Sequence, residues 1–159
     1  MSRAHECAAK VLALAAVLDG RIPEYDPARV EAWADCFQGK ELWPREAMQA
    51  VRDHYSKPNA FQIQPGDVIH AVKAMPVTSS PERFADFLAR WSMYPYSTVI
   101  QDMTGISWHP TYPCPEGIQG DAAAEREFHI REFKQFLGEN YNLLIHNAIN
   151  PTNRKQIGQ

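Results

Sequence analysis

The 159-residue sequence lacks the motifs that mark the common classes of enzyme. A phosphate-binding loop needs glycines, a lysine and a serine or threonine at fixed spacing, and no G-x-x-x-x-G-K-[ST] occurs. No G-x-S-x-G frames a serine, and no C-x-x-C or H-x-x-x-H spacing indicates a metal site. We therefore predict a non-enzymatic protein with no cofactor and no metal, in which any ATP-driven step belongs to a partner.

The sequence also has no surplus of basic charge. Its net charge is −3, with nine basic against ten acidic residues up to Pro76 and seven against nine after it. Proteins that hold nucleic acid through its phosphates usually carry a positive surplus or a concentrated basic run. Direct nucleic-acid binding is therefore disfavoured.

Cysteines and long apolar runs are scarce. The three cysteines, Cys7, Cys36 and Cys114, are an odd set without paired spacing, which disfavours a secreted disulfide framework and favours reduced thiols in a cytoplasm. No run reaches the ~18 apolar residues needed to span a bilayer. The apolar run from Val11 to Leu18 is flanked by acidic residues and has no A-x-A cleavage site, which argues against export. We expect no membrane partner.

What the sequence does contain is helical periodicity. Hydrophobic residues make up 45% and charged residues 22%, as in a globular protein. Residues 4–76 predict a four-helix domain whose later helices begin with a proline at the first helical position. The expected apolar faces are Val11, Leu14, Ala15 and Leu18; Val30, Trp33, Ala34 and Phe37; Ala47, Met48, Val51 and Tyr55; and Val68, Ile69 and Val72. Trp33, Val51, Tyr55 and Val68 are expected in the core.

Residues 77–150 predict a helical C-terminal module. Ser80 is expected to cap a helix whose apolar face is Phe84, Phe87, Leu88 and Trp91. Residues 94–120 are rich in proline, glycine and aromatic side chains and predict an irregular segment, with a short strand at 97–100. Asp121 should cap a helix through about Leu137 that Gly138 closes, followed by a helix over 141–149 and a loose tail at 151–159. The predicted fold class is mainly α.

Two groups of residues are candidates for contact with a partner. Arg52, His54 and Lys57 stand at the corner where the third helix ends, and they predict an exposed, mainly basic edge for an acidic partner surface. The alternative is that His54 only caps the helix end. The second group is Trp91, Tyr94, Tyr96, Trp108 and Tyr112, whose rings suit a protein-binding surface. The alternative there is a loop that buries its rings against the helices.

The order of features in the first half resembles the helicase loader and inhibitor domain that actinobacterial phages and prophages encode. That pattern has a leucine- and alanine-rich first helix followed by D-x-R, then a V-x-A-W helix, an A-V-x-x-H-Y helix and P-x-D-V at the start of the last helix. The matching features here are Asp19 and Arg21, Val30 to Trp33, Ala50 to Tyr55, and Pro65 to Val68, within residues 8–75. Where relatives commonly run into an arginine-rich stretch, this chain has "KAMPVTSSPERF".

The resemblance implies a phage-type adaptor in the cytoplasm of a bacterial host. Such an adaptor binds the hexameric DnaB-type replicative helicase, and either loads it onto DNA or inhibits it without hydrolysing ATP. One alternative is a host-takeover or anti-defence protein that inhibits another bacterial enzyme by direct binding. Another is a small enzyme or metalloprotein that uses His109, Cys114 or His129.

Overall fold

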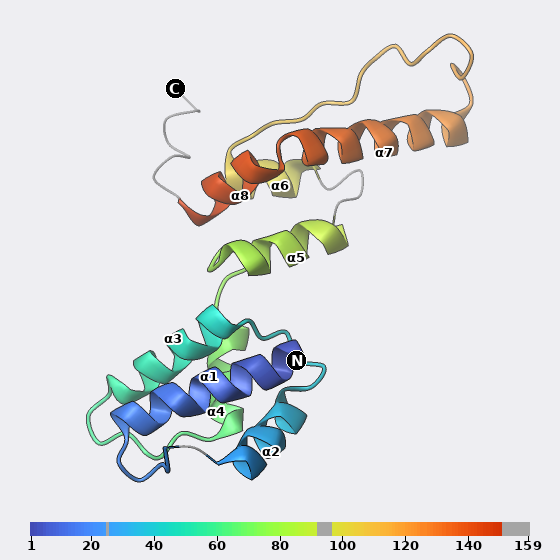
Figure 1. Cartoon of the computed structure of the whole chain (residues 1–159). Coiled ribbons are helices and arrows are strands. Elements are labelled where there is room, and N and C mark those ends of the chain that lie inside the picture. Colours follow the sequence, from blue (N-terminus) through green and yellow to red (C-terminus); the bar gives the residue numbers. More distant parts are fainter. Residues whose placement is uncertain (25, 92–96, 151–159) are drawn as a thin grey trace. The chain divides into compact units, whose positions relative to one another are not determined.

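The structure is a computed structural model that describes residues 1–24, 26–91 and 97–150. The chain divides into two compact units, Met1–Pro76 (unit 1) and Val77–Gln159 (unit 2). Throughout the described ranges, regular secondary structure is helical (Figure 1), and this confirms the mainly α fold class. The predicted tail at 151–159 lies outside the described residues.

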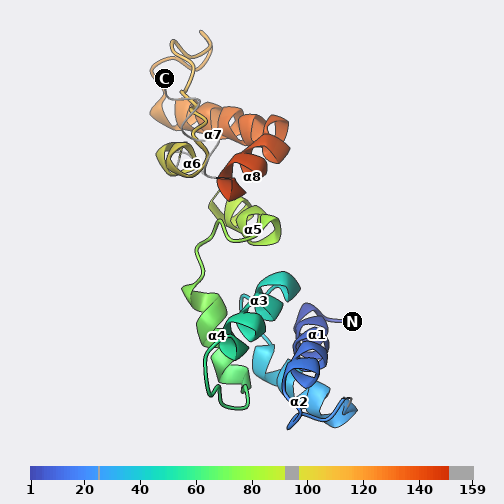
Figure 2. The ribbon, with the colours of Figure 1, turned by 90° about the vertical axis from the view of Figure 1, so that its left-hand side faces the viewer.

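Unit 1 is an assembly of four helices. Helix α1 packs against α2 and α3, and α3 packs against α4 (Figure 2). The bounds are α1 (Arg3–Leu18), α2 (Pro27–Phe37), α3 (Pro44–Tyr55) and α4 (Pro65–Ala74). The four predicted helices are therefore present, and the loops that join them bring distant parts of the sequence together.

The helix ends in unit 1 follow from local chemistry. The Asp26 carboxylate accepts hydrogen bonds from the backbone N–H groups of Ala28 and Arg29 and so caps α2, while Pro27 fills its first position. Gly39 follows the end of α2 with a φ of 70°, a left-handed conformation that glycine adopts without steric cost. These features explain why sequence alone located this helix.

The core of unit 1 contains most of the expected side chains. Trp33, Val51 and Val68 are buried as predicted, and Tyr55 is half-buried with hydrogen bonds described below. One expectation is wrong: Leu18 is 47% exposed, whereas Leu12 is buried. The buried face of α1 is therefore rotated relative to the predicted one. Its other buried residues, which face α2 and α3, are Cys7, Ala8, Val11 and Ala15.

Unit 2 is built around its last helix. Its helices are α5 (Pro81–Trp91), α6 (Ser97–Thr104), α7 (Ala122–Glu139) and α8 (Tyr141–Ile149). Helix α8 contacts α5, α6 and α7 (Figure 1). The core cluster consists of Phe84, Leu88, Ile100, Phe133, Leu137, Leu144 and Ala148. The buried Asn147 donates from Nδ2 to the carbonyl oxygen of Thr104 at 3.1 Å, which ties α8 to the end of α6.

The predicted strand at 97–100 is wrong, because these residues open helix α6. The β-branched residues Thr98, Val99 and Ile100 suggested a strand. In the structure Ile100 is buried, and the N–H of Gly105 donates to the carbonyl of Gln101 at 2.7 Å. Gly105 has a φ of 73°, so it terminates a helix. The predicted irregular segment is therefore interrupted by a helix.

The helix starts predicted in unit 2 are confirmed, and one end is not. Ser80 Oγ accepts from the N–H of Arg83 at the start of α5. Asp121 accepts from the N–H groups of Ala123 and Ala124 at the start of α7. Gly138, expected to close that helix, lies inside it, and α7 continues to Glu139. A glycine can stay helical when the next turn still makes its hydrogen bonds, so a glycine alone does not fix an end.

Candidate functional site

Three segments of unit 1 that are far apart in sequence meet at the end of α3. The Tyr55 hydroxyl donates to Asp19 Oδ2 at 2.9 Å and accepts from the backbone N–H of Ile63 at 3.1 Å. Asp19 is only 6% exposed. The hydroxyl therefore links the end of α1, the end of α3 and the loop that leads to α4.

Arg21 adds a second link to the same loop. Its Nε and Nη2 donate to the two oxygens of Asp19, each at 2.8 Å, and its backbone N–H donates to Asp19 Oδ1 at 3.0 Å. Nη2 also donates to the carbonyl of Ala60 at 3.1 Å. A bidentate arginine–carboxylate pair has strict geometry, so Arg21 fixes the position of this backbone carbonyl.

His54 makes the third link. Its Nε2 lies 2.6 Å from the carbonyl oxygen of Phe61, and because a carbonyl only accepts, Nε2 carries the proton and donates. The His54 ring also meets the Tyr55 ring edge-on, with centroids 4.9 Å apart. We name the resulting arrangement the corner network; it consists of Asp19, Arg21, His54, Tyr55 and the backbone of residues 60–63.

The electrostatics of the corner network favour a fixed ion pair. Hydrogen bonds from Arg21 hold the pKa of Asp19 well below its usual range, and the Tyr55 hydroxyl acts in the same direction. The hydrogen bond to Asp19 raises the pKa of Arg21. Burial raises the pKa of Tyr55. Each group is held in its ordinary charge state, which suits a structural role better than proton transfer.

Of the three residues of the predicted basic edge, two face solvent and one belongs to the corner network. Arg52 and Lys57 are exposed, and their side chains are available to a partner. His54 is half-buried, and its Nε2 is engaged by the carbonyl of Phe61. It binds the following loop instead of capping the last carbonyls of α3. The sequence did not indicate this bond, because a histidine's partner seven residues away is not readable from periodicity.

The predicted aromatic group is only partly described. Tyr94 and Tyr96 lie outside the described residues, and so does the side chain of Trp91. Trp108 is half-buried, with its ring centroid 4.9 Å from that of Phe133. Tyr112 is 67% exposed. Trp108 therefore matches the alternative of a loop folded over the helices, while Tyr112 presents its ring to solvent.

The loop that carries these rings is fastened to α7. Glu132 accepts hydrogen bonds from both the N–H and the hydroxyl of Thr111. His129 Nε2 lies 3.2 Å from the carbonyl of Thr111 and 3.5 Å from Cys114 Sγ. The Tyr112 ring meets the His129 ring edge-on, at 4.8 Å between centroids. A sequence-based description of this segment as simply irregular missed these contacts.

The pairing of Cys114 with His129 bears on the enzyme hypothesis. Because Nε2 faces the Thr111 carbonyl, it carries a proton and cannot accept one from the thiol in this arrangement. Burial raises the pKa of Cys114, and Glu125 and Glu132 raise it further. A nucleophilic cysteine needs the opposite shift. His109, the other residue of that hypothesis, is exposed.

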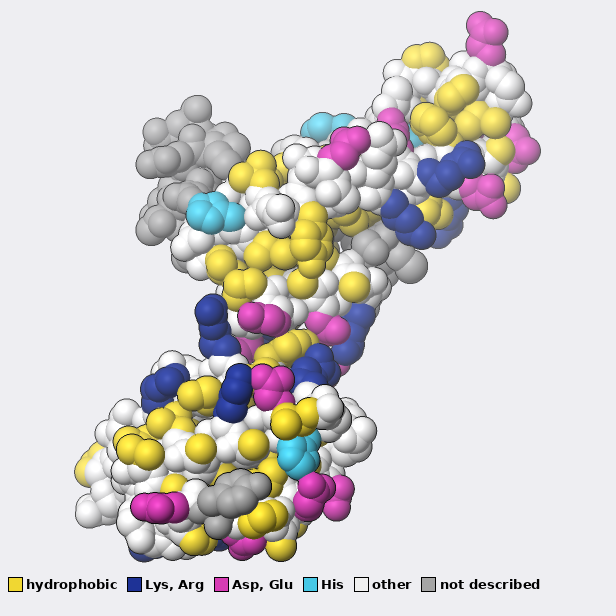
Figure 3. Space-filling view, in the orientation of Figure 1, with side chains coloured by type: hydrophobic (Ala, Val, Ile, Leu, Met, Phe, Trp, Pro, Cys, Tyr) yellow, Lys and Arg dark blue, Asp and Glu magenta, His cyan; other side chains and the backbone are white. Residues whose placement is uncertain are grey.

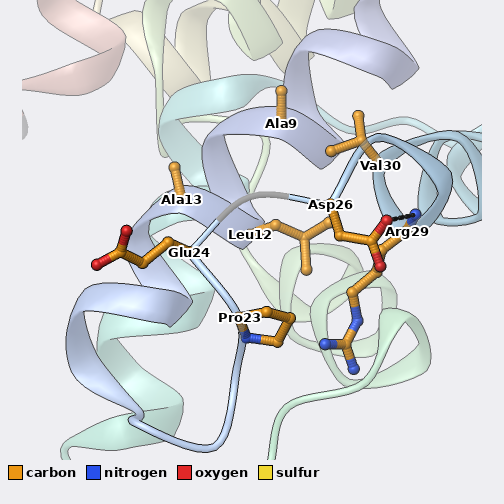
Figure 4. Close-up of a pocket in the computed structure, with 8 residues that line it drawn as sticks. All are labelled: Ala9, Leu12, Ala13, Pro23, Glu24, Asp26, Arg29 and Val30. Atoms are coloured by element: carbon orange, nitrogen blue, oxygen red, sulfur yellow. Dashed lines mark hydrogen bonds between the residues drawn. The ribbon is translucent and has the colours of Figure 1, made fainter.

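Metal, membrane and small-molecule sites are the other possibilities for the described part of the chain. Within residues 1–24, 26–91 and 97–150 no group of three or more His, Cys, Asp or Glu side chains is placed to hold a metal ion. No described helix has the length and apolar character to cross a membrane. A small hollow has a volume of about 30 Å³ (Figure 4), and it is lined by Ala9, Leu12 and Ala13 of α1 and by Pro23, Glu24, Asp26, Arg29 and Val30. It has room for about one or two water molecules, against roughly 300 Å³ or more for a typical small-molecule site.

The residues around that hollow serve the fold. Leu12 and Val30 contribute to the core, and Asp26 caps α2 through the hydrogen bond drawn in Figure 4. A different feature was missed by sequence reasoning: Phe61, within the loop of the corner network, is 83% exposed. The only sequence signal was an aromatic residue in a polar loop, outside any helical stripe.

Comparisons with models of protein families, with curated proteins and with solved structures found no match to this chain.

Proposed function

We propose that this protein is a non-enzymatic, phage-type adaptor that binds the hexameric DnaB-type replicative helicase of a bacterial host. Its effect would be to load the helicase or to inhibit it. The proposal begins from the resemblance of residues 8–75 to loader and inhibitor domains. One observation carries it further: the D-x-R and H-Y features of that resemblance, which are 33 or more residues apart, meet in the corner network.

The geometry of this network supports a docking role. Its charged and polar side chains are bound to one another and to backbone, and together they hold the 56–64 loop in place. Exposed Arg52 and Lys57 stand at its edge. Because these groups are already fixed, little conformational freedom is lost when a partner docks, and this favours binding.

The mechanism would be stoichiometric. A bound adaptor favours whichever state of the helicase ring it binds more tightly, and it shifts the population by that difference in affinity. Arg52 and Lys57 in unit 1 and Tyr112 in unit 2 are the exposed residues proposed to face the partner. Trp91, Tyr94 and Tyr96 stay candidates whose side chains lie outside the described residues, whereas Trp108 packs against Phe133. His54 would contribute by holding the loop.

The proposal is tested by size-exclusion chromatography of the full chain mixed with a purified actinobacterial DnaB-type hexamer. We expect co-elution at higher mass than either protein alone. The double variant Arg52→Glu, Lys57→Glu should elute separately, while Lys40→Glu, at another exposed lysine of unit 1, should co-elute as the wild type does.

Failure of the wild-type chain to co-elute would contradict the helicase assignment. Capture of a different host enzyme from lysate would then favour the host-takeover or anti-defence alternative. Where a complex forms, unwinding and loading assays with the isolated complex decide the sign of its effect on the helicase.

A further inference from the structure

Residues 105–121 of unit 2 form an irregular segment, which we name the strap. It runs from the end of α6 to Asp121, which caps α7, and it lies along the first half of α7 (Figure 1). Cys114 is the one buried residue within the strap, all of which is described. In Figure 3 this end of unit 2 shows apolar side chains at the surface beside charged ones. Little apolar burial therefore holds the strap in place.

Polar contacts hold the strap to α7 at Thr111. The backbone N–H of Thr111 donates to Glu132 Oε2 at 3.1 Å, and its hydroxyl donates to Glu132 Oε1. Its carbonyl accepts from His129 Nε2 at 3.2 Å. All three hydrogen-bonding groups of Thr111 thus meet two side chains that stand three residues apart on α7. We name these three residues, Thr111, His129 and Glu132, the catch.

The packing of the helices in unit 2 does not depend on the catch. Among the described residues, α7 enters the core cluster at Phe133, and residues 122–132 precede that point. The strap adds the half-buried Ile106 and Trp108 to the edge of the cluster, both near its start. Residues 109–120, which we name the lid, lie beyond them. The lid can therefore lift while the four helices stay packed.

The closed lid covers two buried groups. Cys114 is 3% exposed, and its Sγ lies 3.5 Å from His129 Nε2. His129 is 2% exposed, and the ring of Tyr112 meets it edge-on. Thr111, in contrast, is exposed, so water competes for the hydrogen bonds of the catch. Segments with few buried apolar contacts and solvent-exposed hydrogen bonds open at a low free energy.

We infer that residues 109–120 are a latched lid that opens on its own, while the helices of unit 2 stay packed, and that the catch sets how often it opens. This inference goes beyond the proposed function and does not depend on the identity of a partner. The lid carries Tyr112, an exposed ring that directly follows Thr111. A closed catch holds this ring against His129, and an open lid releases it.

The first test measures opening by thiol labelling of the full chain in a Cys36→Ser background, which removes the exposed thiol. A small disulfide reagent in excess labels Cys114 when the lid is open, and peptide mapping separates it from Cys7 of unit 1. Amide exchange of Leu144, in the core of unit 2, reports unfolding of the whole unit. We expect the open state at Cys114 to be at least about tenfold more populated than the open state at Leu144.

The dependence on urea distinguishes local from global opening. Lifting the lid exposes less surface than unfolding does, so opening at Cys114 should depend less on urea than opening at Leu144. Equal populations with equal urea dependence would mean that Cys114 is exposed only when unit 2 unfolds, and this result overturns the inference.

The second test changes the catch. Thr111→Val keeps the branched shape and the backbone bonds but removes the hydroxyl, and it should speed labelling of Cys114 roughly tenfold while leaving Leu144 exchange unchanged. Thr111→Ser keeps the hydroxyl and should label as the wild type does. Wild-type labelling in Thr111→Val overturns the role of the catch. Faster labelling with an equal rise in Leu144 exchange overturns independent opening of the lid.

Discussion

Replacing Tyr55 by phenylalanine tests the corner network with a change of one oxygen atom. The ring and its packing stay, but Asp19 loses a donor at 2.9 Å and the Ile63 N–H loses its acceptor at 3.1 Å. Ile63 is 1% exposed, so water cannot easily replace the lost acceptor. We expect the free energy of unfolding of unit 1 to fall by about 1–3 kcal/mol.

The assay is amide hydrogen exchange of the full chain, read residue by residue by NMR. In Tyr55→Phe the Ile63 amide should exchange faster, and amides of the unit 1 core should lose protection by the amount of the global destabilisation. Amides of the unit 2 core, such as Leu144, serve as an internal reference. Because each kcal/mol shifts the melting temperature of a domain this small by about 4–8 °C, a thermal melt gives a second readout.

The control is Tyr141→Phe, which removes the hydroxyl of an exposed tyrosine at the start of α8. It should change stability by no more than about 0.5 kcal/mol. If Tyr55→Phe exchanges and unfolds as the wild type does, the hydroxyl does not hold the loop. The corner network then does not hold the 56–64 loop in place for docking.

Three further predictions concern pH, thiols and the loop backbone. The pKa of Asp19 in the folded chain lies below its ordinary value of 3.8, so as pH falls the unfolded chain becomes protonated at Asp19 before the folded chain does. The wild type should therefore be more stable than Asp19→Asn by its full margin above about pH 5, and the margin should shrink as pH falls through 4 and below. Urea unfolding at each pH measures it. A pH-independent gap would contradict the ion pair. In native protein only Cys36 should react rapidly with a thiol reagent, because Cys7 and Cys114 are buried. Burial also raises the pKa of both buried thiols, that of Cys7 to about 11. A count of two rapidly reacting thiols would contradict this and would favour a reactive Cys114. Asn59 has a φ of 57°, so Asn59→Ala should lose about 1 kcal/mol in urea unfolding while Asn59→Gly loses less, and equal losses would show that the left-handed conformation is not the cause.

The parts of the fold that sequence predicted are those governed by neighbours in the chain. Prolines at the first helical position, such as Pro27 and Pro65, and capping carboxylates, such as Asp26 and Asp121, act within one turn and marked helix starts correctly. The error at 97–104 arose because β-branched residues favour strands until tertiary burial decides otherwise, here through Ile100 against the α8 core.

The candidate site depended on contacts that local patterns do not encode. Tyr55 meets Asp19 across 36 positions of sequence, and Arg21 meets the carbonyl of Ala60 across 39. A helical stripe indicated that Tyr55 faces inward but not which groups its hydroxyl meets. The backbone around Phe61 is held by this long-range network, so the exposure of its ring is visible only in the folded chain.

The central claim is that this protein acts by docking through the corner, and titration of the full chain against a purified actinobacterial DnaB-type hexamer tests it most directly. The account predicts a stable complex with the wild type, affinity at least about tenfold lower for the double variant Arg52→Glu, Lys57→Glu, and identical unfolding curves for the two proteins. Equal affinities for the two proteins, or no complex with the wild type, would contradict it.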